Sequence, residues 1–181
     1  MNELQTRCLD TFPEWLRALA TDAADLAKVL EANDAPDIAR RYAAAGLNYL
    51  FKSLDLIPDG IEDLGFLDDA FVVRVAAALA LREAPAAKDA FPVLARLADG
   101  ATLVSDLLGK DYARLERYVQ GLRVGAARGR TVDDILKDAQ VRAAFLGEVG
   151  GWTASYEAPS FSRDEKNLVK LQSFLGAKLP S

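Results

Sequence analysis

Residues 53–69 read SLDLIPDGIEDLGFLDD and combine six acidic side chains with one proline and two glycines. Proline and glycine in this arrangement are typical of a chain reversal, and grouped carboxylates are typical of either helix caps or a cation site. Pro58 has no backbone N–H and disfavours a helical conformation at Ile57. We therefore expect a helix to end near Asp55 and the chain to reverse before the next helix.

The flanking sequence predicts an all-α fold. Apolar residues recur at steps of three and four, and no segment shows the sustained alternation of a strand, so we expect no strands. One helix is predicted over about residues 12–32, because Thr11 and Glu14 have the spacing of a capping box. The next helix is predicted to open at Asp34, with Pro36 in its first turn.

The segment after the acidic loop is predicted to be the central helix. Residues 69–83 are apolar on nearly every side, which is typical of a helix surrounded by other helices. Leu54 belongs to the apolar stripe of the preceding helix. We expect a helical hairpin over about residues 42–83 at the centre and additional helices over about 86–181. No repeat or linker is found, so residues 1–181 are predicted to form a single compact domain of about seven to nine helices.

Three signals divide the C-terminal half into helices. Thr131 and Asp134 indicate a helix start, and the glycines at 150–151 indicate a break or kink. Ser162 and Glu165 have capping-box spacing, which predicts the start of the last helix. These expectations concern local structure and do not identify a function.

Helix capping is the first explanation that we consider for the acidic loop. Asp59 and Glu62 have the spacing of reciprocal caps, and Gly65 is expected to end their turn in a left-handed conformation. Asp68 is expected to cap the central helix. Each cap contributes about 0.5 to 2 kcal/mol, so caps and ion pairs are sufficient to explain these residues.

A divalent cation is the alternative explanation. Oxygen ligands suit calcium or magnesium, and an irregular site is conceivable from Asp55, Asp59 and either Asp68 or Asp69. The EF-hand pattern is excluded, because its twelfth position counted from Asp55 falls on Phe66 rather than on an acid. We expect no cofactor and no required metal, with these four aspartates as the candidate ligands.

The sequence LDLIPDGIEDLGFLDDAFVV resembles the domain of unknown function 1232, the YkvA-like family. Residues 55–59 correspond to its central motif and residues 64–69 to the motif that follows. The resemblance covers about residues 42–83 and implies a helical hairpin of unknown molecular function, in bacterial proteins some of which look membrane-associated. Residues 60–63 are more polar than the family's usual pattern. The motif residues are Asp55, Pro58, Asp59, Gly65, Asp68 and Asp69.

Charge and hydropathy bear on location and partners. The formal net charge of -5 disfavours nucleic acid and anionic lipid as partners. The longest uncharged run, residues 42–51, is half the roughly 20 residues that span a bilayer. Cys8 is the single cysteine, and the N-terminus lacks the pattern of a secretory signal. A cytoplasmic location is therefore predicted.

The chemistry of the chain favours a non-enzymatic protein. It has no histidine and one cysteine, so the usual general base and nucleophile pairs are missing. We expect an interaction or structural module with a protein partner and no nucleic acid. Two alternatives stay open: a divalent-metal-binding protein or carboxylate-dependent enzyme that uses the acidic loop, and a peripheral membrane protein. The oligomeric state does not follow from the sequence.

Arg74 is the only charged residue between Asp69 and Arg82 in the predicted central helix. A buried guanidinium needs a partner, so we expect an ion pair with a carboxylate of the loop, Asp55 or Asp59 first. Such a pair would tie the loop to the helix.

Overall fold

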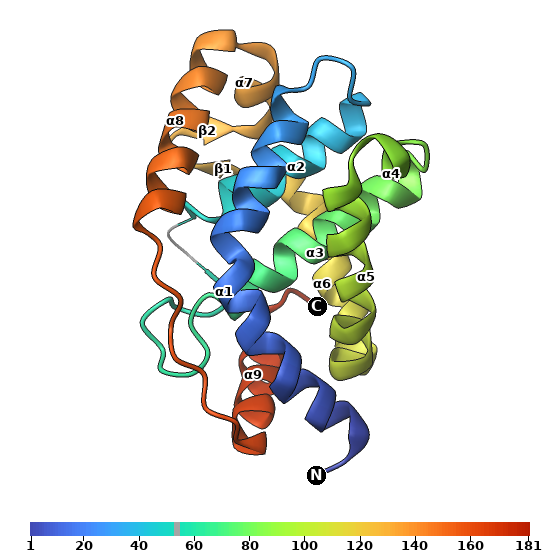
Figure 1. The fold of residues 1–181 in the computed structure, drawn as a ribbon, viewed down its shortest axis with the longest axis vertical. Helices are drawn as coiled ribbons and strands as arrows, with labels where there is room; N and C mark the ends of the chain where they lie inside the picture. The colour runs from blue at the N-terminus through green and yellow to red at the C-terminus, as the bar shows by residue number, and fades with distance from the viewer. Residues whose placement is uncertain (53–54) are drawn as a thin grey trace.

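The computed structural model describes residues 1–52 and 55–181. Ser53 and Leu54, with the place predicted for Leu54 in an apolar stripe, lie outside these ranges. The all-α prediction is confirmed (Figure 1). The elements are α1 (Glu3–Glu31), α2 (Asp37–Tyr49), α3 (Leu67–Glu83), α4 (Ala87–Ala90), α5 (Pro92–Leu108), η1 (Gly109–Asp111), α6 (Tyr112–Gly121), η2 (Leu122–Val124), β1 (Ala126–Ala127), β2 (Arg130–Thr131), α7 (Val132–Lys137), α8 (Ala139–Ser155) and α9 (Glu165–Lys178).

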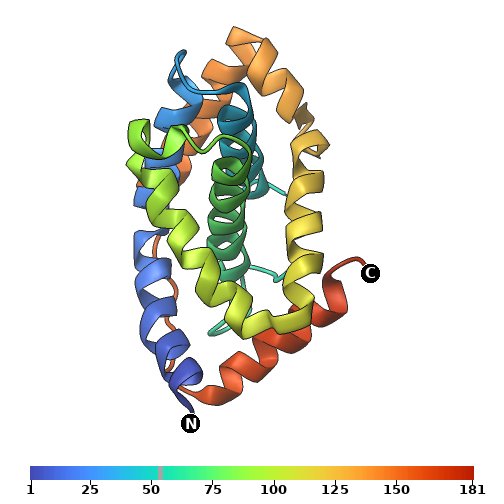
Figure 2. The same cartoon turned by 90° about the vertical axis from the view of Figure 1, so that its right-hand side faces the viewer.

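The helix α3 lies at the centre, as its sequence predicts. Every residue from Leu67 to Ala77 is buried. The helices α1, α2, α5 and α6 all contact α3, and Figure 2 shows it running between α5 and α6. Gly46 of α2 lies against Val73 and Ala76 of α3, where a Cβ would meet both side chains at 3.6 Å. The small residues of α2 therefore let the two helices of the hairpin pack closely.

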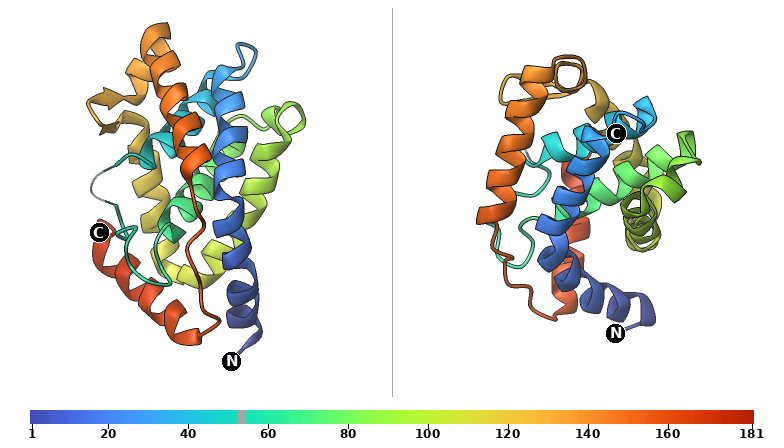
Figure 3. Two further views of the ribbon diagram at one scale, coloured as in Figure 1. Left: turned by 60° about the vertical axis from the view of Figure 1, so that its left-hand side comes forward. Right: turned by 45° about the horizontal axis from the view of Figure 1, so that its top comes forward.

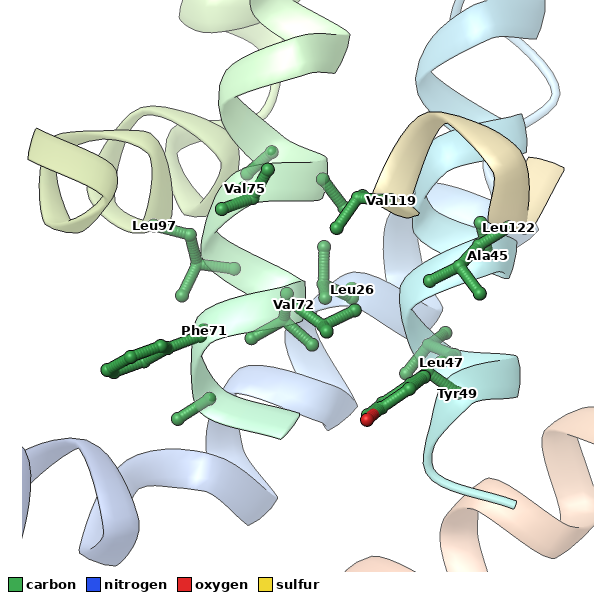
Figure 4. Packing of buried hydrophobic residues seen from close by; sticks show 14 of the residues in the cluster. Leu26, Ala45, Leu47, Tyr49, Phe71, Val72, Val75, Leu97, Val119 and Leu122 are labelled. Carbon is green, nitrogen blue, oxygen red and sulfur yellow. The ribbon is translucent and has the colours of Figure 1, made fainter. Parts of the chain in front are cut away.

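The buried apolar side chains form one cluster that extends from Cys8 to Leu179. Figure 4 shows its middle, where Phe71 and Val72 of α3 lie among side chains of α1, α2, α5 and α6. Burying a side chain such as Leu26 fully contributes about 1.5 to 3 kcal/mol. Burial of apolar side chains against several neighbouring helices therefore stabilises the position of α3. That residues 1–181 form a single domain stays a prediction.

The start predicted for α1 is wrong. The helix begins at Glu3, where Asn2 and Gln5 form a capping box with hydrogen bonds of 2.8 Å. Pro13 lies inside the helix, although proline removes one backbone hydrogen bond. The ring of Phe12 packs at 5.2 Å from that of Phe71 in α3, and this contact offsets the loss. Local signals such as proline are outweighed here by tertiary packing.

The bounds predicted for α2 are also corrected. Pro36 occupies the N-cap position, so the helix begins at Asp37 and not at Asp34. The helix ends at Tyr49, well before Asp55, and two tight turns follow in which the N–H of Lys52 donates to the carbonyl of Tyr49 at 3.0 Å. The Tyr49 hydroxyl accepts a hydrogen bond from the backbone N–H of Leu56 at 2.8 Å, which joins the start of the acidic loop to the end of α2.

The C-terminal half follows its sequence signals in part. The capping box of Thr131 and Asp134 is confirmed at the start of α7. A break at 150–151 is wrong, because both glycines lie inside α8, and the alternative of a kink stays a prediction. The last helix is capped by Asp164, whereas the Ser162 side chain accepts a hydrogen bond from Asn167.

The strands β1 and β2 correct the prediction that the chain has none. They form a two-residue antiparallel hairpin whose turn residues, Arg128 and Gly129, have φ angles of 50° and 77°. Two successive positive φ angles are required by the tightest hairpin turns, and glycine supplies one of them without strain. A run of two residues is too short to show a period in the sequence.

An extended segment, residues 156–164, connects α8 to α9 and runs beside α1 (Figure 3). Its Tyr156 hydroxyl donates to the carbonyl of Leu16 at 2.7 Å, and its Ser162 N–H donates to the carboxylate of Asp63 at 2.7 Å. The segment therefore fastens the acidic loop to α1 from outside.

Candidate functional site

Three carboxylates converge where the acidic loop meets α3. One oxygen each of Asp59, Asp68 and Asp69 lies within 4.8 Å of the others. Asp59 comes from the loop, whereas Asp68 and Asp69 lie in the first turn of α3. The N-terminus of a helix carries a partial positive charge, which favours acids at these positions. Of the four predicted candidates, these three are brought together, and Asp55 is left out of the cluster.

Asp68 does not cap α3, so this prediction is wrong. Phe66 occupies the N-cap position in a left-handed conformation, and its side chain makes no cap hydrogen bond. The carboxylate of Asp68 is fully buried and accepts hydrogen bonds from the Tyr49 hydroxyl at 2.6 Å and from the Ile57 N–H at 3.2 Å. Asp68 thus ties the end of α2 and the loop to α3.

The loop conformation also departs from the predicted caps. Among the described residues, the side chains of Asp59 and Glu62 make no reciprocal hydrogen bonds; the Ile61 N–H donates instead to the carbonyl of Pro58 at 3.1 Å. The left-handed positions are Asp63 and Phe66, and Gly65 is not among them. The prediction that Gly65 ends the turn in a left-handed conformation is therefore wrong.

Gly65 is required by close packing. A Cβ there would lie 2.1 Å from the carbonyl oxygen of Asp59, a contact that forces the backbone to move. We expect Gly65→Ala to lower the free energy of unfolding by about 1 to 3 kcal/mol. Gly60→Ala is the matched control in the same loop, because its Cβ would meet nothing within 4 Å. Urea unfolding of both variants measures the difference, and equal stabilities would contradict the close packing.

Arg74 is buried and paired, but not with the loop. Its guanidinium donates to Asp22 of α1 at 3.2 Å and to the carbonyl of Ala70 at 3.0 Å. It also lies 4.0 Å from the centre of the Trp15 ring. Asp55 and Asp59 form no ion pair with it, so the predicted partners are wrong. The reason is geometric: these contacts direct the side chain to α1, away from the loop.

Several carboxylate oxygens at the site are buried without a hydrogen-bond partner among the described residues. They are Asp55 Oδ1, Asp68 Oδ1 and Asp69 Oδ2. Asp69 is 2% exposed. Within residues 1–52 and 55–181, no lysine or arginine forms an ion pair with Asp55, Asp59, Asp68 or Asp69. A buried charge without a partner is costly, so the group gains a proton or takes up a cation.

The pKa values of these groups reflect that cost. Burial raises the pKa of Asp69 well above its ordinary value, and the charges of Asp68, Asp59 and Asp55 raise it further. Burial, followed by Asp68 and Asp59, raises the pKa of Asp55 to about 7. Burial raises the pKa of Asp68 to about 6 against its hydrogen bonds from Tyr49 and Ile57. Burial also raises the pKa of Asp59.

The donor set suits a hard divalent cation. Carboxylate oxygens are the ligands of calcium and magnesium, and three of them leave positions for water or a further ligand. Asp59 is exposed while Asp68 and Asp69 are buried, so the cluster opens to solvent on the loop side. The arrangement is therefore able to take up a cation from solution.

Two partners of the site were missed by the sequence analysis. One is Tyr49, because nothing in the sequence indicates a hydrogen bond from its hydroxyl to an aspartate 19 residues later. The backbone N–H of Ile57 carries no sequence signal at all. Both contacts depend on the path of the loop, which the tertiary fold determines.

Fold and site together define a helical protein with a partly buried carboxylate cluster at the junction of two helices. Residues 39–74 match the model of a family described as Protein of unknown function (DUF1232). This confirms the resemblance over a segment, which begins and ends earlier than the expected 42–83. All the predicted motif residues and Arg74 lie inside it. No curated protein and no solved structure matches the chain.

A helix that spans a membrane needs about 20 consecutive, predominantly apolar residues. Across residues 1–52 and 55–181, no helix combines the length and the apolar character needed to cross a bilayer.

Proposed function

We propose that this protein binds a divalent cation, Mg²⁺ or Ca²⁺, through Asp59, Asp68 and Asp69. The observation that carries the proposal is the buried Oδ2 atom of Asp69, which has no partner among the described residues although two other carboxylates lie beside it. A cation would supply a partner to the unpaired oxygens of Asp68 and Asp69 and bind the exposed carboxylate of Asp59 at once. It would also offset the burial and the neighbouring negative charges that raise the pKa of Asp69.

The wider role that we propose is a non-enzymatic interaction module. Residues 58–60 are exposed, while Asp68 and Asp69 belong to the rigid start of α3. A cation shared between Asp59 and α3 would hold the exposed loop in one conformation for a protein partner. The lack of histidine supports a role without catalysis, as does the buried Cys8, whose pKa burial raises to about 11.

Cation binding is tested by calorimetric titration with Mg²⁺ and Ca²⁺ and by thermal melting. A ligand at one hundred times its Kd stabilises the folded state by about 2.7 kcal/mol. For a domain of this length that raises Tm by about 5 to 10 °C. We expect this rise with one of the two cations, and its reversal by EDTA.

The variant Asp69→Asn keeps the shape of the side chain and removes one ligand charge. We expect it to weaken cation binding by at least about tenfold, since hydrogen bonds or contacts to charged groups are worth about 1.5 to 3 kcal/mol. Glu62→Gln is the matched control, because it removes the same charge from an exposed position of the same loop. Cation affinity that is unchanged in Asp69→Asn, or absent from the wild type, would refute the proposal.

A further inference from the structure

A cavity of about 610 Å³ adjoins the carboxylate cluster, between the end of α2 and the β1–β2 hairpin. Asp59 belongs to both, because it lines the cavity and contributes an oxygen to the cluster. The volume is within the range of pockets that hold small molecules, about 300 to 1,000 Å³. The lining residues are Leu50, Phe51, Lys52, Asp59, Ala126, Ala127, Arg128 and Gly129.

Two cationic side chains, Lys52 and Arg128, line this cavity. Lys52 forms no ion pair within the described parts of the chain, and its ammonium lies 5.9 Å from the centre of the Tyr118 ring. Arg128 forms a long ion pair with Glu148 at 3.8 Å, and its side chain is 59% exposed. A ligand therefore meets an unpaired charge at Lys52 and competes with Glu148 for Arg128.

The hairpin turn holds Arg128 at this position. Arg128 has a φ of 50°, a left-handed conformation that costs free energy in any residue with a side chain. Its guanidinium lies 4.9 Å from the centre of the Phe51 ring, which forms part of the apolar wall. The turn therefore places the guanidinium of Arg128 over an aromatic ring that lines the cavity.

The charges predict a ligand that depends on the cation. Without it, the ionised carboxylates of the cluster repel an anion. A bound divalent cation adds two positive charges beside Lys52 and Arg128 and removes that repulsion. The apolar residues that line the cavity favour a ligand that carries an apolar group in addition to its anionic group.

We propose that this cavity binds a small phosphate monoester, with phosphoryl oxygens coordinated to the cation and hydrogen-bonded to Lys52 and Arg128. Phosphate oxygens are hard donors that complete the coordination of Mg²⁺ where a protein supplies few carboxylates. Lysine and arginine both bind phosphate through charge-assisted hydrogen bonds. This inference rests on the proposed cation site and names the ligand class of that same site.

Phenyl phosphate is the probe, because it joins a phosphate monoester to an apolar ring. Its binding is measured by calorimetry with the full-length protein in saturating Mg²⁺ and, separately, in EDTA. We expect binding in Mg²⁺ that weakens at least about tenfold in EDTA. Lys52→Ala and Arg128→Ala are each expected to weaken it about tenfold, the loss of one charge-assisted hydrogen bond. Lys88→Ala and Arg117→Ala, which change exposed residues outside the cavity, are expected to bind as the wild type does.

Titration with Mg²⁺ alone separates the two proposals. Mg²⁺ binding without phenyl phosphate binding, or phenyl phosphate binding that is equal in EDTA, overturns the ligand and leaves the cation site intact. Failure of Mg²⁺ and Ca²⁺ to bind overturns both. Vesicles that contain phosphatidic acid distinguish the source of the phosphate. If the protein co-sediments with these vesicles and phenyl phosphate reverses this, the ligand is a lipid headgroup. If the protein binds phenyl phosphate but does not co-sediment with the vesicles, the ligand is a soluble ester.

Discussion

Asp22→Asn is expected to lower the free energy of unfolding by about 3 to 5 kcal/mol, the cost of leaving a buried charge without its partner. The Asp22 carboxylate has no exposed surface and pairs with Arg74 at 3.2 Å and with Arg96 at 2.6 Å. Arg74 is 4% exposed, so solvent is unable to replace the lost charge. Burial already lowers the pKa of Arg74 to about 10, against the opposing effect of Asp22.

Urea unfolding measures this loss, and Asp25→Asn is the matched control. Asp25 also pairs with Arg96, at 3.3 Å, but both side chains of that pair are partly exposed. An exposed pair contributes about 0 to 1 kcal/mol, so the control is expected to change little. In Arg74→Met, which removes the buried cation, Asp22→Asn should cost much less. Equal losses in Asp22→Asn and Asp25→Asn would contradict the importance of the buried pair.

The Arg74 pair illustrates which part of the fold could be predicted from the sequence. An arginine inside a helix that is apolar on nearly all sides indicates a buried charge with a partner, and this is correct. The prediction that a carboxylate of the acidic loop is this partner is wrong, because the partner is Asp22 in α1. A signal for it exists: Asp22 falls between Leu19 and Leu26 at steps of three and four, on the stripe that faces the core. A charge on the apolar stripe of each of two helices predicts that they meet.

The acidic loop shows why the rest could not be predicted. Capping rules are local, and they hold at Asn2 and Thr131, whose side chains form only local hydrogen bonds within the described residues. The carboxylate of Asp68 instead accepts hydrogen bonds from the hydroxyl of Tyr49 and the N–H of Ile57, and it does not cap the helix. The sequence therefore predicts that the loop carries grouped acids, but the convergence of three of them depends on the path of the chain.

Stability is expected to fall as pH rises from about 4 to about 7 when no divalent cation is present. A carboxyl group whose pKa is higher in the folded than in the unfolded state binds more protons when folded, so its contribution is present at low pH and is lost as it ionises. Burial raises the pKa of Asp68 to about 6 and that of Asp55 to about 7. One pKa unit corresponds to about 1.4 kcal/mol, so Asp68 alone accounts for a decrease of roughly 3 kcal/mol.

The direction is diagnostic, because carboxylates that form helix caps or ion pairs have lowered pKa values and make a protein more stable as pH rises. The chain contains no histidine, so no side chain with an ordinary pKa titrates between pH 5 and 8, and the slope in that range reports the acidic site. Urea unfolding in EDTA across this range measures it. Asp69→Asn is expected to flatten the slope and to raise stability at neutral pH, since it removes a buried carboxyl group whose pKa is raised well above its ordinary value. Glu62→Gln should leave the slope unchanged. If the wild-type protein instead gains stability between pH 4 and 7, its buried carboxylates already have favourable partners in the folded state. That result would also contradict the proposed cation site.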